Sequence, residues 1–345
     1  MKSTLFDLHE KSGARMVDVD GWQAPDVFTS VEAEYAAAQE RAVVYDSLPL
    51  GRLRLTGATR VDFLHRMSTN ELNALEPGQG AATVLTTPTA RIIDRVIVYL
   101  READVLLLTS RGAQALVAAW LKRYIFFNDD VQVRDASGEW GMMSIYGAKA
   151  AEVASRLAGR EVTDLRLHAW QPIDDQSILA RADPIAGDGF HLLAAAPERL
   201  RMLWQAAIAA GAAPIGEQAF EVLRIESGRP RFARELSEAH IPLEVGLWAD
   251  VSFSKGCYVG QEIIARMESR HRLAKQMIGL RSGAPIAPAS EIRLDGAVVG
   301  KVTSSAVRPG GDAIAIGLIK PAHAAAGTRV SLDGGSVAEV TAFPR

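Results

Sequence analysis

A single cysteine stands in this chain of 345 residues, and that count limits what can hold the fold together. One thiol cannot form an intramolecular disulfide, and it cannot build an all-thiolate metal site without another chain. The fold must therefore be stabilised by apolar cores, for which a hydrophobic content of 48% is sufficient. A lone cysteine also fits a reducing compartment, so we predict a cytoplasmic protein.

The cysteine lies in a glycine-framed octapeptide, Lys255-Gly256-Cys257-Tyr258-Val259-Gly260-Gln261-Glu262, which leads into a helix-like run over residues 261–270. The glycines free the backbone for a tight turn or for close approach to a ligand. The nearby ammonium of Lys255 and a helix N-terminus would both favour thiolate over thiol. The alternative is a small buried cysteine beside a solvated lysine, and the residues alone leave both interpretations open.

With the preceding segment 241–247, the octapeptide resembles the signature of YgfZ-type folate-binding proteins, relatives of the glycine-cleavage T-protein, an aminomethyltransferase. The aminomethyltransferases keep the lysine, an aromatic residue and the second glycine, whereas Cys257 and Gln261 are typical of the YgfZ branch. The resemblance implies that Cys257 is the functional thiol and that Lys255 tunes it. The remaining motif residues would shape the loop or orient its neighbours, namely Gly256, Tyr258, Gly260, Gln261 and Glu262.

The order of helix and strand signals predicts an α+β fold. Ser30 can cap a helix over 31–45, and an apolar stripe predicts another helix over 59–70. Alternating or β-branched runs predict strands over 51–57, 91–100 and 104–109. A helix over 110–124 would place Leu116, Trp120 and Tyr124 on one side. From residue 276 onward, short strands separated by Asp-Gly turns predict a small β-barrel.

The resemblance covers nearly the whole chain and implies an aminomethyltransferase-like fold, with three domains around a central folate channel. A discontinuous α/β domain would comprise residues 1–50 and 141–272 and carry the octapeptide. An α+β domain over 51–140 would be inserted in it, and residues 273–345 would form the C-terminal barrel.

Charge and hydropathy argue against two classes of partner. The chain has 38 basic and 41 acidic residues, a formal charge of −3, so no global positive field would attract nucleic acid. No apolar run reaches the length of a membrane-spanning helix, and the N-terminus lacks a signal-peptide pattern. We therefore expect no direct nucleic-acid binding and no membrane insertion.

The chain departs from the T-protein pattern where that family carries a catalytic aspartate. The family motif ends in two adjacent aspartates, and this chain reads Asp94-Arg95. Asp94 would point to the opposite face of its strand, because strand side chains alternate. A guanidinium in the acid's place would repel a forming iminium, so Arg95 argues against a true aminomethyltransferase.

Other positions along the expected folate path also differ from the T-protein. Pro184 and Gly187 stand where that family has a tyrosine and a glutamate, and Phe220 replaces an arginine. Candidate folate contacts that remain are Asp94, Arg224 and Arg266. Arg266 also opens a basic run, which is either a solvated helix end or a contact for phosphate or polyglutamate: Arg266, Arg270, His271, Arg272 and Lys275.

Three functions remain open on these grounds. The resemblance favours a folate-binding accessory protein of iron–sulfur cluster assembly or repair, which would support enzymes such as radical-SAM enzymes that modify tRNA. Its cofactor would be tetrahydrofolate or a derivative, its partners would be iron–sulfur client or assembly proteins, and the chain alone would hold no metal. The alternatives are a tetrahydrofolate-dependent aminomethyltransferase and a plain binding module.

Overall fold

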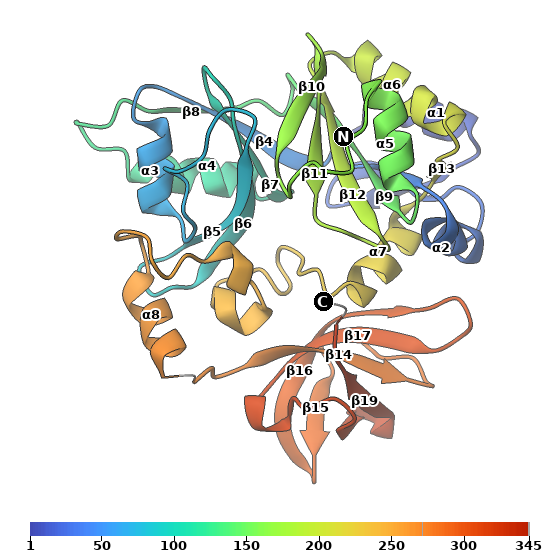
Figure 1. Ribbon diagram of the computed structural model, residues 1–345. Helices are drawn as coiled ribbons and strands as arrows, with labels where there is room; N and C mark the ends of the chain where they lie inside the picture. Colours follow the sequence, from blue (N-terminus) through green and yellow to red (C-terminus); the bar gives the residue numbers. More distant parts are fainter. Residues whose placement is uncertain (271, 344–345) are drawn as a thin grey trace.

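The computed structural model describes residues 1–270 and 272–343, which form two large β-sheets, a closed β-barrel and a small two-stranded sheet (Figure 1). The first sheet draws its strands from two separate stretches of the chain. In spatial order it contains β10 (Trp170–Asp174), β11 (Ser177–Ala182), β12 (Asp188–Ala194), β9 (Gly141–Gly147), β3 (Val43–Asp46) and β13 (Ala213–Pro214). Helix α1 (Phe6–Lys11) and the hairpin of β1 (Arg15–Val19) and β2 (Trp22–Val27) precede it.

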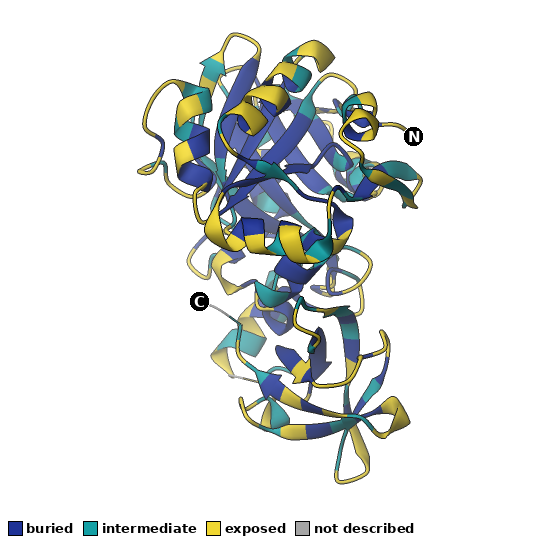
Figure 2. Ribbon diagram, turned by 90° about the vertical axis from the view of Figure 1, so that its right-hand side faces the viewer, coloured by how far each residue is buried: buried dark blue, intermediate teal, exposed yellow. Residues whose placement is uncertain are grey.

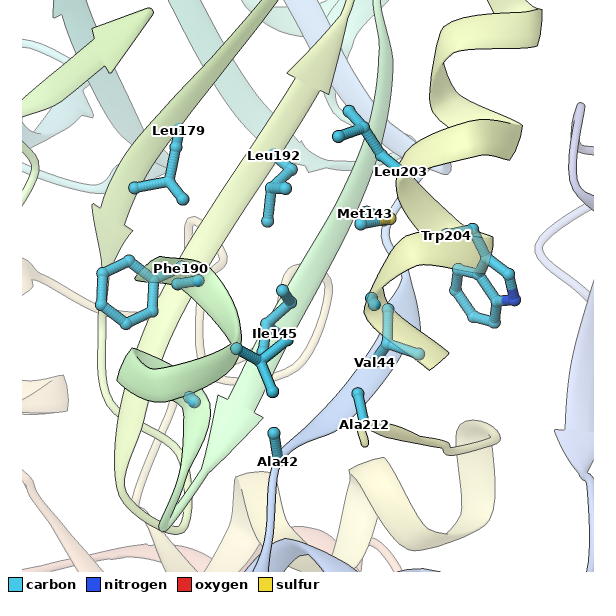
Figure 3. Close-up of a cluster of buried hydrophobic side chains, with 14 of the residues drawn as sticks. Ala42, Val44, Met143, Ile145, Leu179, Phe190, Leu192, Leu203, Trp204 and Ala212 are labelled. Carbon is cyan, nitrogen blue, oxygen red and sulfur yellow. The ribbon is translucent and has the colours of Figure 1, made fainter. Parts of the chain in front are cut away.

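Helices cover both faces of the first sheet. On one face, α5 (Ala150–Ala158) and α6 (Pro197–Ala209) close an apolar core, and Figure 3 shows Leu203 and Trp204 of α6 beside the strand residues Met143 and Val44. Figure 2 shows buried strands behind helices whose outer faces are exposed. On the other face, α2 (Val31–Glu40) and α7 (Glu217–Glu226) pack against the end of the sheet formed by β3 and β9.

The second sheet is antiparallel and contains β5 (Gly80–Thr86), β6 (Ile92–Leu100), β7 (Val105–Arg111), β4 (Leu50–Thr56) and β8 (Gln132–Asp135). Helices α3 (Arg60–Met67) and α4 (Gln114–Arg123) cover its outer face. Its inner face packs on the first sheet through Tyr99 and Leu106, which meet Met142 and Leu193 in one apolar cluster. The two sheets are therefore joined back to back over part of their length.

The C-terminal strands form a closed antiparallel barrel. In order around the barrel they are β14 (Gln276–Ser282), β17 (Ala313–Ile319), β16 (Ala297–Val307), β15 (Glu291–Leu294), β18 (Arg329–Leu332) and β19 (Val337–Thr341). Two 3-10 turns connect strands here, η3 (Pro321–His323) and η4 (Asp333–Gly335). Val222 and Ile225 of α7 pack on Ile314 and Ile316, which attaches the barrel to the first sheet's helix.

The connection between α7 and the barrel lies beneath the second sheet. It contains the 3-10 turns η1 (Pro242–Val245) and η2 (Trp248–Asp250), then the octapeptide and α8 (Gln261–Ser269). Figure 1 places α8 below α3 at the outer edge of that sheet. The octapeptide therefore packs on strands and helices of residues 51–140, although its predicted domain was the discontinuous one; the domain boundaries themselves stay a prediction.

The predicted α+β class with a C-terminal barrel is confirmed, whereas the predicted end of the first helix is wrong. The helix from Ser30 ends at Glu40, because the β-branched and aromatic run that follows, Val43–Asp46, forms the buried strand β3. Helix α4 buries Val117 and Leu121, whereas Leu116 is exposed. Edge strand β10 was not predicted. Within residues 1–270 and 272–343, no helix combines the length and hydropathy needed to cross a bilayer.

Asp94 is fully buried on β6 and is separated from solvent by the packing of the second sheet. The backbone N–H of Ser110 donates to its Oδ2 at 2.9 Å, while Oδ1 has no partner among the described residues. Burial raises the pKa of Asp94 to about 7. The carboxyl is therefore held in a site that favours its neutral form.

The burial of Asp94 predicts that the free energy of unfolding depends on pH. Because the folded pKa of Asp94 exceeds the unfolded value, the folded state binds more protons between about pH 4 and 7, and stability falls as the pH rises through that window. Asp94→Asn removes the titration. We expect its free energy of unfolding, relative to the wild type, to increase by about 2–4 kcal/mol from pH 4 to pH 7.5. Urea unfolding at both pH values measures this; a constant difference would contradict it.

Candidate functional site

Backbone hydrogen bonds tie the octapeptide to its own preceding segment at one end and to α3 and β5 at the other. The Lys255 N–H donates to Ser252 Oγ at 3.2 Å, and the Val259 N–H donates to the Arg66 carbonyl at 3.3 Å. Thr86 Oγ1 donates to the Val259 carbonyl at 2.7 Å. The loop is thus held against the C-terminal end of α3 and the end of β5, and α8 begins directly after it.

Lys255 is buried, and its ammonium is committed to backbone carbonyls. Nζ donates to Ser68 O at 2.8 Å, to Asn70 O at 2.7 Å and to His65 O, all at or just beyond the C-terminal end of α3. These carbonyls lack helical partners and sit at the negative end of the helix dipole. Burial lowers the pKa of Lys255 to about 8. Lys255 therefore anchors the loop to the end of α3. The sequence predicted only that Lys255 tunes Cys257.

The other motif residues divide into buried and exposed groups. Cys257 is exposed, whereas the next side chain, Tyr258, packs with Ile241 and Ile264 in an apolar cluster. Burial raises the pKa of Tyr258 to about 12, so its hydroxyl stays neutral. The sulfur therefore projects outward from a loop whose adjacent ring is fixed in the core.

Gly260 and Gly256 are not equivalent. Gly260 has φ +87°, and a Cβ there would lie 2.8 Å from Thr86 Oγ1 and 2.9 Å from the Thr87 carbonyl. A Cβ at Gly256 would meet nothing within 4 Å. Only the second glycine is thus required by the packing, although the sequence suggested the same freedom for both.

The two charged candidates on α8 lie on its surface. Arg266 Nη2 donates to Glu262 Oε1 across one helical turn at 2.5 Å, and both side chains are mostly exposed. Gln261 is the first residue of α8. Neither Arg266 nor Glu262 lines a described cavity, and His271 of the basic run lies outside the described residues.

A cavity of about 620 Å³ opens between the first two sheets, beyond the cluster that joins them. It takes residues from β3, β6, β7, β9 and β12, from α7 and from segment 229–234. Cavities of this size accommodate drug-sized organic ligands. Arg95 and Arg224 line it, whereas Asp94 and Cys257 do not. The cavity and the exposed thiol are therefore two separate features.

Aromatic and polar groups are paired at one side of this cavity. Tyr45 and Phe220 stack with ring centroids 4.0 Å apart, and Phe220 stands where the resemblance places an arginine. Arg111 Nη2 donates to Glu217 Oε1 at 2.6 Å and to the Tyr45 hydroxyl at 3.0 Å. Arg224 donates to the Glu221 carboxylate at 2.7 and 2.8 Å. This wall combines a flat apolar surface with fixed cations, as a ligand with a ring and carboxylates requires.

Arg95 forms a buried ion-pair cluster in the wall of the same cavity. Its Nε donates to Asp250 Oδ2 at 2.6 Å and its Nη1 to Asp183 Oδ2 at 2.7 Å, while Arg229 Nη1 donates to Asp183 Oδ1 at 3.1 Å. Burial alone would raise the pKa of Asp183, but the charges of Arg95 and Arg229 hold it well below its usual range. The Asp183 carboxylate therefore stays ionised, and Arg95 is not a free cation.

A third polar group consists of hydroxyls and an imidazole. Ser47 Oγ lies 2.6 Å from Ser144 Oγ, which lies 2.8 Å from His191 Nδ1. Ser47 and His191 line the cavity, and burial lowers the pKa of His191 to about 3. The imidazole is therefore neutral, and this chain of hydrogen bonds ends in the cavity at both sides.

The lining fits an anionic organic ligand. Arg111 Nη1 and Arg229 Nε belong to cavity residues, are buried and have no hydrogen-bond partner among the described residues. Buried donors without acceptors are costly, and a carboxylate or a pterin carbonyl of a folate would satisfy them. Among the described residues, no cluster of three or more His, Cys, Asp or Glu side chains could hold a metal ion.

Comparison with known proteins identifies the scaffold. The family model described as the GCVT N-terminal domain matches residues 5–255. The chain belongs to this family. It is 34% identical to the putative transferase At1g60990, chloroplastic, of Arabidopsis thaliana, over 99% of this chain and 80% of the relative.

Aminomethyltransferases are also among its relatives. The one from Streptomyces coelicolor is 30% identical, over 95% of this chain and 91% of the relative. The crystal structure of glycine cleavage system aminomethyltransferase T from Bartonella henselae superposes with a TM-score of 0.88 at 22% identity, covering 99% of this chain and 96% of the other. That similarity confirms the aminomethyltransferase fold predicted from the sequence.

Sequence reasoning missed several cavity residues. Asp183 pairs with Arg95 and Arg229, which come from distant parts of the chain, and His191 and Ser144 are neighbours only across a pair of strands. No local motif surrounds them. The signal available was the charge of Asp183 immediately before Pro184, in the turn where the resemblance already placed folate contacts.

The glycines provide a matched pair for testing the loop. Gly260→Ala should lower the free energy of unfolding by about 1–3 kcal/mol, because it adds a close contact at a positive φ. Gly256→Ala should change it by less than about 0.5 kcal/mol, because the added methyl meets open space. Urea unfolding of both variants measures the contrast, and equal effects would contradict the assigned loop geometry.

Lys255 can be tested separately from the thiol. Lys255→Met leaves three buried carbonyls without their donor and should destabilise the protein by about 2 kcal/mol or more. Cys257→Ala, at an exposed position, should leave stability within about 0.5 kcal/mol of the wild type. If Lys255→Met were as stable as the wild type and changed only the alkylation rate of Cys257, the structural role would be refuted.

Proposed function

We propose that this protein is a YgfZ-type, folate-binding accessory protein of iron–sulfur cluster assembly or repair that acts through Cys257. The observation that carries the proposal is the exposed, single thiol on a loop anchored by Lys255 and by the buried ring of Tyr258. A loop held this firmly keeps its sulfur accessible at a fixed place. Radical-SAM enzymes that modify tRNA are the proposed clients.

A single cysteine limits how this protein could bind an iron–sulfur cluster. One thiolate supplies one ligand, so a cluster at Cys257 takes its remaining ligands from a partner protein or from small thiols. The cluster is then cargo that passes through the protein. The proposal places the protein in a reducing compartment, where the thiol stays free.

Tetrahydrofolate or a derivative is the proposed ligand of the cavity. The Tyr45–Phe220 stack would receive a ring system, and Arg111 and Arg229 would bind carboxylates or carbonyl oxygens through their unpaired nitrogens. Bound there, a reduced folate carries one-carbon units. The residues of this chain bind and orient it, and Arg95 is held away from acid–base work by its two carboxylate partners.

The second candidate is a tetrahydrofolate-dependent aminomethyltransferase. The names of the relatives favour it, and the cavity does contain an ionised carboxylate, that of Asp183. Against it stands the pairing of Asp183 with Arg95 and Arg229, which neutralises the negative charge that a forming iminium would need.

Complementation of cells that lack the protein tests the first candidate. Cys257→Ser replaces sulfur with oxygen at an exposed position, so the protein should fold normally. Cells that carry this variant should have at least tenfold less iron–sulfur enzyme activity than cells that carry the wild type. Unchanged protein levels and urea midpoints serve as the control. Full restoration of activity by Cys257→Ser would refute the role of the thiol.

An assay for one-carbon transfer separates the two candidates. An aminomethyl-charged carrier protein and tetrahydrofolate are mixed with the purified protein, and methylene-tetrahydrofolate is measured. The accessory role predicts formation at the rate of the control without protein. Multiple turnovers by the wild-type protein would instead establish the transferase.

A further inference from the structure

Three buried polar side chains form a continuous path of hydrogen bonds along the wall of the cavity. Ser47 Oγ lies 2.6 Å from Ser144 Oγ, which lies 2.8 Å from His191 Nδ1. The three residues are 2%, 0% and 5% exposed. Ser47 and His191 line the cavity, whereas Ser144 lies between them and does not. We call this set the serine–histidine relay.

The relay crosses the central strands of the first sheet. Ser144 on β9 is paired with His191 on β12 and, on its other side, with Tyr45 on β3. Ser47 directly follows β3, and its hydrogen bond to Ser144 keeps its hydroxyl on the same face of the sheet. The positions of all three groups are therefore set by strand pairing.

While both hydrogen bonds are kept, the relay has two arrangements of its protons, because each hydroxyl has only one. In the first arrangement Ser47 donates to Ser144 and Ser144 donates to Nδ1 of His191, so the imidazole proton is on Nε2. In the second, Nδ1–H donates to Ser144 and Ser144 donates to Ser47, whose own proton is then available to the cavity. Exchange between the two arrangements moves a donor from one end of the relay to the other.

Both arrangements require a neutral imidazole, which the surroundings of His191 favour. Burial lowers the pKa of His191 to about 3, and the neighbouring His168 and Arg95 act in the same direction. Asp183 acts against them, but its carboxylate is bound to Arg95. Because Nδ1 is bonded within the relay, Nε2 is the nitrogen left for a ligand. It has no hydrogen-bond partner among the residues that the structure describes.

The two ends of the relay are consequently opposite in kind. When Ser47 offers the cavity an acceptor, His191 Nε2 offers a donor, and the second arrangement reverses the two roles. A carboxylate only accepts hydrogen bonds and an ammonium only donates them, so each would leave one end without a partner. A group with one donor and one acceptor satisfies both ends. The amide or amidine edge of a heterocycle has this pattern.

Aromatic rings beside the relay provide a surface for such a heterocycle. Tyr146 is edge-on to His191, with ring centroids 6.4 Å apart. Phe220 lies 5.9 Å from the Tyr146 ring and 4.0 Å from the Tyr45 ring. All four side chains line the cavity. Flat apolar surface and paired neutral hydrogen-bonding groups thus occur together on one wall.

We propose that the serine–histidine relay selects the ring of the cavity's ligand by requiring one hydrogen-bond donor and one acceptor, with Ser144 as the positioning residue that couples the two ends. This inference rests on the proposed function and deepens it, because it names the chemistry of the ring: a neutral heterocycle with an amide or amidine edge, as in a pterin. The anionic part of the ligand is left to Arg111 and Arg229, whose Nη1 and Nε have no partner among the described residues.

Two fragments of the proposed ligand test this selection. Methyl-tetrahydropterin has the ring and no carboxylate, whereas p-aminobenzoylglutamate has the carboxylates and no pterin. Ser144→Ala should weaken the binding of tetrahydrofolate and of methyl-tetrahydropterin about fivefold or more, because neither end of the relay is then held in a defined role. Binding of p-aminobenzoylglutamate should change by less than about twofold. Titration calorimetry on the purified full-length protein measures both.

Ser177→Ala is the matched control. Ser177 on β11 is a buried serine of the same sheet, donates to Asp174 Oδ1 at 2.7 Å and lines neither described cavity. This variant should bind both fragments as the wild type does, and urea midpoints show that each variant is folded. If Ser144→Ala weakens both fragments equally, or neither, selection by the relay is overturned.

The tautomer of His191 provides a readout that a general loss of stability would not move. Nitrogen NMR of histidine-labelled protein distinguishes protonated from unprotonated ring nitrogens, and His191→Gln assigns the signals. Ser47→Ala should change the tautomer ratio in the ligand-free protein by at least about twofold, although Ser47 is bonded to Ser144 and not to the imidazole. It should have no such effect in the Ser144→Ala background. Identical His191 signals in the wild type and Ser47→Ala would refute the coupling.

Binding of tetrahydrofolate separates failure of the relay from failure of the proposed function. If the wild type and Ser144→Ala bind tetrahydrofolate and methyl-tetrahydropterin equally well, only the relay is refuted. If the wild type does not bind tetrahydrofolate, the proposed function loses its ligand, and the tautomer measurement on the ligand-free protein still decides whether the three groups are coupled. Weaker ring binding by Ser144→Ala, with unchanged binding of p-aminobenzoylglutamate and an unaffected Ser177→Ala, is the expected result.

Discussion

The buried guanidinium of Arg95 is the contact on which the arrangement of this molecule depends. It lies on the inner face of the second sheet and binds Asp183 from the first sheet and Asp250 from the connection that leads to the octapeptide. Its partners lie 88 and 155 residues away in sequence. Arg229 also pairs with Asp183, so removing Arg95, Asp183 or Asp250 would leave one charge of the cluster without its partner, and the cluster requires all three segments in place.

Local patterns were sufficient for most of the fold. The β-branched run of β6 and the Ser30 cap of α2 are signals that act within a few residues, and each marks an element of the structure. The errors arose where tertiary packing decided. Val43–Asp46 follows good helix formers but is a central strand, because the first sheet needs a buried partner between β9 and β13.

The octapeptide could be recognised from the sequence, but the structural role of each of its residues could not. Nothing in the sequence shows that Lys255 reaches three carbonyls at the end of α3, since those acceptors are backbone atoms nearly two hundred residues earlier. The lining of the cavity was equally hidden. Asp183, Arg229 and His191 come together only through strand pairing and the loop after α7, and no spacing rule links them.

Helix α7 contacts both the cavity and the C-terminal barrel. Phe220 and Arg224 line the cavity, while Val222 and Ile225, on another side of the same helix, are embedded in contacts with the C-terminal barrel. A rigid rod shared in this way transmits displacement. A change in the position of α7 at the cavity would therefore also change its packing against Ile314 and Ile316 of the barrel.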